Sequence, residues 1–148
     1  LIQRILAALK ADRKVMEEAA REAHENATGE ETRSEGKYDT RAIEAAYLAG
    51  AQSAQAAKLA EAIRLFETLD PVDYGDDEVI GPGALVETEH DGEILFYFLG
   101  PAAGGVTVEH EGFDCTVLTP DSRLYQELLG SRAGELLDGS GAMVLGVA

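Results

Sequence analysis

Four carboxylates crowd into ten residues of the N-terminal half: Glu30, Glu31, Glu35 and Asp39. Carboxylate oxygens are hard ligands that suit Mg²⁺, a cation that keeps several waters and shares its site with other groups. A pair of these acids could therefore complete a magnesium site that another molecule mainly supplies. Acids are also common at helix starts, where they interact favourably with the helix dipole, so an ordinary solvated turn is the alternative interpretation.

The other residues with catalytic potential do not form a recognisable set. His24, His90 and His110 lie far apart and have no Cys or His at ligand spacing, so we expect them on the surface. Cys115 has no identifiable base and lies in an apolar run, which favours a buried structural thiol. The glycine-rich run at 100–105 precedes a strand-like segment and contains no Lys, so it predicts a turn rather than a phosphate-binding loop.

Two helix-forming segments flank the acidic residues. Over residues 42–66 apolar side chains recur at spacings of three and four, the pattern of a coiled coil, with Gln52 as the one polar member. A weaker repeat of the same kind covers residues 2–26, where two polar residues interrupt it. Between the repeats, residues 28–36 are polar and include two glycines, which predicts a turn.

The two repeats match by size when the chain folds back at this turn. Large side chains then meet at one end and alanines meet near the turn. We therefore expect an antiparallel hairpin of helices over residues 2–28 and 37–68, about 40 and 48 Å long at 1.5 Å per residue. The expected alanine contacts are Ala45 and Ala49 against Ala19 and Ala23. A Leu at position 49 would overpack this section and cost roughly 1–3 kcal/mol.

Charge is distributed unequally along the chain, whose formal net charge is −16. Residues 1–70 carry 10 Lys and Arg against 13 acids, whereas residues 71–148 carry only Arg123 and Arg132 against 15 acids. Binding to a phosphate backbone requires a basic patch, so the second half predicts no binding to free DNA. A basic protein surface is the expected partner, and acidity that serves only solubility is the alternative.

The second half has the texture of strands and turns. Pro, Gly and Asp at 71–78 predict a linker. Dipeptides Asp91-Gly92 and Glu111-Gly112 predict two hairpins, and a short helix is expected to end at Gly130. The expected strands are 84–90, 93–99, 104–110, 113–118 and 142–147. The sequence therefore predicts an α+β chain, with a hairpin at 1–70 and, at 79–148, one short helix on an antiparallel sheet.

The cellular location follows from cysteine use and hydropathy. A single Cys cannot form an intramolecular disulfide, which fits the cytosol. The opening segment is amphipathic and interrupted by Arg4, which predicts no signal peptide, and no stretch of the sequence reaches the length of a membrane span. We expect a cytoplasmic monomer without membrane contact. Since the sequence does not begin with Met, residues before Leu1 are left open.

Two passages resemble the GreA/GreB family of transcript-cleavage factors. Residues 32–44, TRSEGKYDTRAIE, are similar to the family's hairpin tip, where D-x-x-E-N-x-E-Y leads into the returning helix. Residues 122–135, SRLYQELLGSRAGE, are similar to the family's S-P-x-x-x-x-L-[IL]-G-K-x-x-G-D segment. The resemblance implies an FKBP-like domain at 79–148 that binds RNA polymerase, and a hairpin, with its acidic tip at 29–36, that enters the polymerase's secondary channel.

In that family two tip acids help to hold Mg²⁺ at the polymerase active site, where the backtracked transcript is hydrolysed. The resemblance implies that Glu31 and Glu35 are this metal-holding pair. It also implies that the protein binds no cofactor stably on its own and is an accessory factor rather than an enzyme. The match is incomplete, because Thr32 or Ser34, depending on the register, stands where the family has an acid.

These departures keep other functions open. Arg123, Ser131 and Glu135 stand where the family has Pro, Lys and Asp. A regulator or inhibitor that occupies the channel without stimulating cleavage is therefore the first alternative. A coiled-coil adaptor or chaperone unrelated to transcription is the second, although a polar, acidic tip disfavours it. A prolyl isomerase is the third, and the scarcity of aromatic residues disfavours its aromatic-lined cleft.

Overall fold

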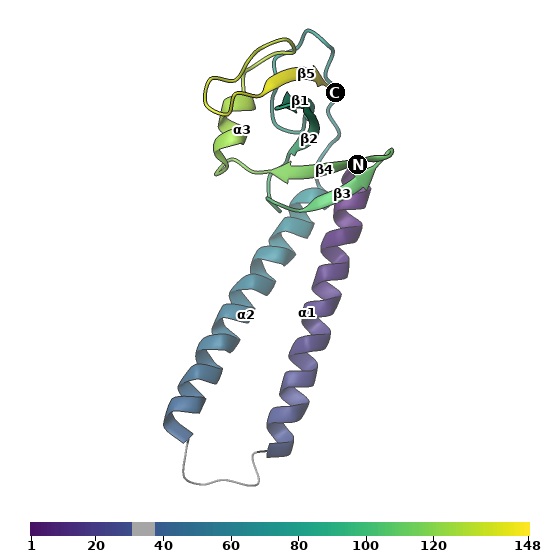
Figure 1. Ribbon diagram of the computed structural model, residues 1–148. Helices are drawn as coiled ribbons and strands as arrows, with labels where there is room; N and C mark the ends of the chain where they lie inside the picture. The colour runs from purple at the N-terminus through teal and green to yellow at the C-terminus, as the bar shows by residue number, and fades with distance from the viewer. Residues whose placement is uncertain (31–37) are drawn as a thin grey trace.

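The computed structural model describes the backbone of residues 1–30 and 38–148 and the side chains of residues 1–26 and 47–148. Two long helices come first, and a five-stranded sheet with one short helix follows (Figure 1). The predicted α+β class is confirmed. In chain order the elements are α1 (Ile2–Glu30), α2 (Tyr38–Glu67), β1 (Leu85–His90), β2 (Glu93–Leu99), β3 (Thr107–His110), β4 (Phe113–Leu118), α3 (Arg123–Leu128) and β5 (Met143–Val147).

The two long helices form the expected antiparallel hairpin. Their observed bounds agree with the predicted ranges to within two residues. Where they meet the sheet, large apolar side chains from both helices are buried: Ile5, Leu6, Leu9, Ile63 and Phe66. Figure 1 shows the helices leaving the sheet as two arms that diverge with distance from it. The hairpin is therefore packed at its base and open farther out.

The predicted alanine seam is wrong. Ala19, Ala23 and Ala49 are all exposed, so Ala49 does not pack against the other two, and the side chain of Ala45 lies outside the described residues. The physical reason is the small apolar area that alanines offer. Burial stabilises by about 0.8 kcal/mol for each CH₂ group, so a contact between methyl groups gains little. The large residues at the base hold the helices together, and the alanines do not.

The sheet has the strand order β3-β4-β2-β1-β5. Both predicted hairpins form, because β1 pairs antiparallel with β2 and β3 pairs antiparallel with β4. However, β4 pairs with β2 in parallel, so the sheet is mixed. The prediction of a sheet that is antiparallel throughout is therefore wrong. The more apolar strand of the second hairpin takes the inner position: β4 buries Cys115 and Val117, whereas β3 exposes Thr107 and Glu109 at the edge.

Both hairpin turns use the residues that the sequence indicated. Asp91 and Gly92 have φ values of 52° and 84°, and Glu111 and Gly112 have 52° and 91°. Positive φ at both central positions is the geometry that fits the right-handed twist of the strands. In each turn the glutamate three positions before the glycine accepts a hydrogen bond from the glycine N–H, Glu89 at 2.7 Å in the first turn and Glu109 at 2.9 Å in the second.

Two apolar clusters lie on opposite faces of the sheet. On one face, Phe98 and Val117 of the sheet pack with Ile63 and Phe66 of the hairpin base. The rings of Phe66 and Phe98 lie 6.2 Å apart. On the other face, the sheet packs against α3 and the final loops, through residues Val86, Leu99, Tyr125, Leu128 and Val144. The first cluster belongs to the hairpin and the sheet together, so it fixes one against the other.

This packing predicts different effects on stability for two apolar substitutions in the hairpin. Ile63→Ala removes a buried side chain at the base and should lower the free energy of unfolding by about 2–5 kcal/mol. Ala49→Leu adds an exposed side chain and should change it by about 0.5 kcal/mol or less. Urea unfolding followed by circular dichroism measures both. A large loss of stability in Ala49→Leu would indicate that Ala49 is packed between the helices, and would contradict its exposure in the structure.

Candidate functional site

Glu31 and Glu35, the predicted metal-holding pair, lie outside the described residues, so this pair stays a prediction. The backbone on either side is described: α1 ends at Glu30 and α2 begins at Tyr38, both at the end of the hairpin away from the sheet (Figure 1). As donors, carboxylates fit Mg²⁺. In the part of the chain that the structure describes, no group of three or more His, Cys, Asp or Glu side chains could hold a metal ion.

The arms give the hairpin a long reach. Helices of 29 and 30 residues are about 44 and 45 Å long at 1.5 Å per residue. Charged pairs lie along α1, where Arg13 is 3.6 Å from Glu17. One pair links the two helices near the base, where Lys10 is 2.7 Å from Glu67 and lowers the pKa of that carboxyl through a hydrogen bond. The hairpin is thus a slender, solvated projection from the sheet.

A polar contact also ties the first helix to the edge of the sheet. The Arg4 guanidinium donates to the backbone carbonyl of Glu109 at 2.8 Å and to its carboxylate at 2.9 Å. The same carboxylate accepts the Gly112 N–H, and these two bonds, that of Gly112 first, lower the pKa of Glu109. The contact occupies an outward-facing carbonyl of edge strand β3 and orients α1 against it.

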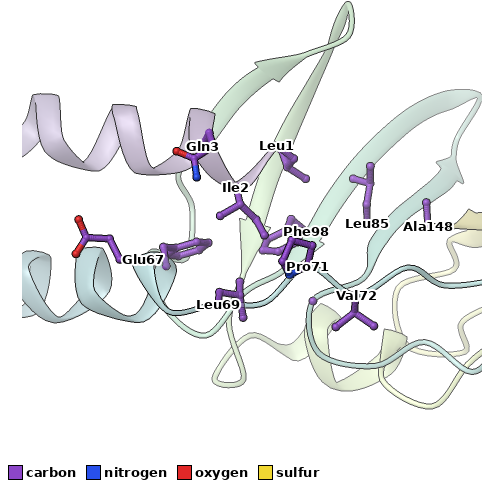
Figure 2. Close-up of a pocket in the computed structure, with 12 residues that line it drawn as sticks. Leu1, Ile2, Gln3, Glu67, Leu69, Pro71, Val72, Leu85, Phe98 and Ala148 are labelled. Carbon is purple, nitrogen blue, oxygen red and sulfur yellow. The ribbon is translucent and has the colours of Figure 1, made fainter.

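An apolar cavity of about 410 Å³ lies between the start of α1, the end of α2 and the sheet (Figure 2). Its walls are aliphatic or aromatic, and they include Ile2, Leu69, Leu85 and Phe98. Its polar side chains are Gln3 and Glu67, which Figure 2 shows on the helical side of the cavity. Because Glu67 is paired with a lysine and no base or nucleophile accompanies it, this cavity carries no catalytic set.

A wider groove, about 1070 Å³, runs between the hairpin and two loops of the sheet domain. It is lined by Leu9, Asp12, Met16, Lys58, Leu59, Pro101, Ala102, Thr119, Pro120 and Asp121, among others. The lining is mostly apolar and its charged side chains are mainly acidic. A shallow, open groove of this kind suits contact with a protein surface better than it suits a reaction that must exclude water.

The passage at 122–135 starts beside this groove and forms a helix with a fixed end. Ser122 caps α3 by accepting a hydrogen bond from the Tyr125 N–H. Gly130 has φ 89° and donates its N–H to the carbonyl of Ile80, so the chain turns back onto the sheet as the predicted helix stop implied. Ser122 and Gly130, two positions at which this passage matches the GreA/GreB segment, therefore define the start and the end of α3.

At two positions this passage differs from the GreA/GreB segment that it resembles, and the structure shows the contacts that both residues make. Ser131, which stands at the family's Lys, is buried and donates its hydroxyl to the carbonyl of Leu128 at 2.7 Å. That position therefore projects no charge to a partner. Arg123, which stands at the family's Pro, pairs with Glu127 at 3.0 Å. The backbone N–H of Ser140 also donates to Glu127. Hydrogen bonding from Ser140, with its side chain as the largest contribution and its backbone N–H next, and then from Arg123, lowers the pKa of the Glu127 carboxyl.

The histidines and the cysteine do not come together. His24 is exposed, while His90 and His110 are half-buried at different strands, and the ring of His110 lies edge-on to Phe113 at 5.5 Å. Cys115 is buried, and burial raises the pKa of its thiol to about 12. A thiol with this pKa is protonated at neutral pH and is not a nucleophile. The expected burial of Cys115 is confirmed.

Comparisons with known proteins give a short result. No protein-family model and no curated protein matches the chain. The crystal structure of GreA factor homolog 1 (Gfh1) of Thermus thermophilus is 24% identical with a TM-score of 0.38, and the match covers 99% of this chain and 94% of that one. The crystal structure of Thermus aquaticus Gfh1 is 22% identical with a TM-score of 0.35, and the match covers 98% and 92%.

Hydropathy adds one finding on membranes. Among the described residues, no helix is long and apolar enough to span a bilayer.

The Cys115 thiol gives a pH dependence that can be measured. In the unfolded chain a thiol ionises near about 8.5, whereas in the folded protein the pKa is about 12. Between these values only the unfolded state gains from ionisation, so the free energy of unfolding should fall as pH rises from 8 toward 11. Cys115→Ala should be less stable near pH 8, where a buried side chain is shortened, but should lack this part of the slope. Urea unfolding of both proteins across this range measures the difference, and identical slopes would contradict the buried-thiol account.

Proposed function

We propose that this protein is an RNA polymerase-binding regulator of transcription elongation. The C-terminal region, 79–148, is proposed to be an FKBP-like binding module that docks on the polymerase. The hairpin would then enter the secondary channel and bring its turn toward the active site. In this role the protein is a cytoplasmic, monomeric accessory factor, and the hydrolytic chemistry belongs to the polymerase.

The observation that carries this proposal is a long hairpin packed at its base on a sheet domain, with Glu31 and Glu35 in the segment between its two helices. The length of α1, about 44 Å at 1.5 Å per residue, suits a probe that reaches into a narrow channel. The shared apolar cluster around Phe66 and Phe98 supports a fixed direction for that probe. The two passages at 32–44 and 122–135 that resemble the GreA/GreB family add sequence support in the same order along the chain.

Electrostatics support a protein partner for the sheet domain. Its two arginines already have partners: Arg123 pairs with Glu127, and Arg132 donates to the backbone carbonyl of Asp77 in the preceding segment, 71–78. The domain's remaining acids therefore present an uncompensated negative field, which repels nucleic acid and attracts a basic protein surface.

Stimulation of transcript cleavage is the finer part of the proposal, and it rests on Glu31 and Glu35. These carboxylates would complete the coordination of a Mg²⁺ that the polymerase mainly holds. When bound, that ion would position and activate the attacking water. The protein's own part is to deliver two acidic side chains to the correct depth.

Two alternatives each have a specific observation in their favour. Thr32 or Ser34, depending on the register, stands where the GreA/GreB tip has an acid, which favours a channel-occupying inhibitor without cleavage activity. On the arms, Val15, Tyr47 and Leu48 are 65%, 78% and 60% exposed, which favours an adaptor or chaperone that grips clients between its helices. A client-binding chaperone should suppress aggregation of unfolded proteins in the absence of polymerase, so a light-scattering assay separates this class from the others.

Binding is the first test of the proposal. The protein should bind purified bacterial RNA polymerase, and its affinity should fall as salt rises, because a basic surface would face an acidic domain. It should not bind free duplex DNA at physiological salt. Fluorescence anisotropy with labelled protein or labelled duplex measures both. Tight, salt-sensitive binding to naked DNA would contradict the proposal.

Cleavage is the second test. In stalled, backtracked polymerase complexes, Glu35→Gln should keep polymerase binding but lose most of the cleavage stimulation, because one ligand charge is removed while the shape is kept. Glu18→Gln makes the same change at an exposed position on α1 and should retain stimulation. If wild-type protein competes with a genuine cleavage factor and yields no cleavage at any Mg²⁺ concentration, the inhibitor function replaces this one.

A further inference from the structure

The hairpin covers only part of the sheet face against which it packs. At the strand ends beside the turns 91–92 and 111–112, this face carries large apolar side chains that solvent reaches. Ile94 is 56% exposed and Leu136 is 60% exposed, while Phe96, Phe113 and Met143 are half-buried. Exposed apolar side chains gathered at one end of an otherwise strongly acidic domain are typical of a protein contact site.

Strand register shows that these residues share one face. Glu89 is paired with Ile94 on one side and with Met143 on the other, and Met143 is bridged to Leu136. Because paired residues point to the same side of a sheet, they form one row across it. Alternate residues along a strand share a face, which adds Phe96 beside Ile94.

The aromatic end of this face is built by two strands. Phe96 of β2 and Phe113 of β4 stack with their rings 3.9 Å apart, and His110 of β3 lies edge-on against Phe113. Both rings come from strands that pair directly with each other. The stack therefore offers a preformed apolar platform at little cost in side-chain entropy.

Two carboxylates stand in the middle of the apolar residues. Glu87 and Glu89 of β1 are half-buried, with Ile94 and Phe96 on one side and Met143 on the other. One oxygen of Glu89 accepts the Gly92 N–H. No Lys, Arg or His among the described side chains forms an ion pair with either carboxylate. An incoming cation would therefore meet two carboxylates that lack an ion-pair partner among the described residues, next to apolar side chains that its stem can contact.

A glycine leaves room for that cation. Gly146 of β5 is paired with Glu87, and a Cβ placed on it would lie 3.9 Å from the nearer carboxylate oxygen. With no side chain at this position, the surface next to Glu87 is open between the apolar residues on either side. A long side chain could therefore reach the carboxylate while its stem lies on Met143.

We propose that this face, defined by Glu87, Glu89, Ile94, Phe113 and Met143, docks a basic amphipathic segment of a partner protein. An Arg or Lys of the partner pairs with the two glutamates, and its aliphatic neighbours cover Ile94 and Met143. Anionic lipid and nucleic acid are excluded as occupants, because the acids at the centre and at both turns repel them. The inference does not depend on the proposed function, because any protein with a basic amphipathic segment could bind this face.

The face is separate from the groove described above. It lies at the strand ends where β2 begins with Glu93 and β4 begins with Phe113, next to the two hairpin turns. The groove instead includes Thr119–Asp121, which follow the opposite end of β4. The sheet domain can therefore hold a second partner segment while the groove is occupied.

A titration of ¹⁵N-labelled protein with a short peptide of alternating Leu and Arg tests the proposal by NMR. Shift changes should centre on Glu87, Ile94 and Gly146. The double variant Glu87→Gln/Glu89→Gln should bind the peptide about tenfold more weakly, since charge pairing in a desolvated site is lost. The matched control Asp73→Asn/Asp76→Asn removes two exposed acids elsewhere and should bind as the wild type does. Amide dispersion in each spectrum verifies that the variants fold.

The apolar part of the face is tested without any change in charge. Ile94→Ala should weaken binding about fivefold, because apolar contact area is lost. A peptide with Ser in place of Leu should bind the wild type about tenfold more weakly. Equal weakening by both double variants, shift changes centred on residues 73–78, equal binding of the Ser peptide or absence of binding would each overturn the proposal.

Discussion

The burial of the hairpin base against the sheet is the interaction on which the rest of the structure depends. Phe66 and Ile63 of α2 and Ile5 of α1 lie in the same apolar cluster as Phe98 and Val117 of the sheet. Without these contacts the sheet would expose one of its faces, and the two helices would have nothing to define their direction. Isolated helices gain most of their stability from packing, so the base orders the helices as well as their orientation.

The strength of packing falls along the hairpin in step with side-chain size. Near the sheet both helices supply large apolar residues, and Lys10 and Glu67 add a charged link. Farther out α2 offers mainly Ala, Gly, Ser and Gln, and the arms separate. Helix propensity is highest for Ala, so the chain remains helical where it has little to pack against. Length and local helicity are thus obtained without a continuous core, which is what an extended projection requires.

Sequence patterns predicted those features that depend on local chemistry. The helix limits and the turns at Asp91-Gly92 and Glu111-Gly112 were correct, because periodicity and positive φ act over a few residues. The alanine seam failed because a 3,4 pattern gives the position of a side chain on a helix but not the energy of its contact. The parallel pairing of β4 with β2 was missed because it joins strands through a long connection. The acidic face of Glu87 and Glu89 was missed since it exists only in the register of three strands.

The distribution of charge follows from the same architecture. The sheet domain has only Arg123 and Arg132 to offset its acids, and both have partners, Arg123 in Glu127 and Arg132 in the backbone carbonyl of Asp77. Among the described residues, Arg4 of the hairpin forms an ion pair with the sheet domain, at Glu109 of β3. The carboxylates of β1, farther across the sheet, receive no such residue from the described part of the hairpin. Their compensation must come from water or from another molecule, and apolar neighbours on both sides limit how much water can supply. The sheet face beyond the hairpin therefore combines exposed apolar side chains with carboxylates that have no cationic partner among the described residues, which is the combination that a basic partner segment would cover.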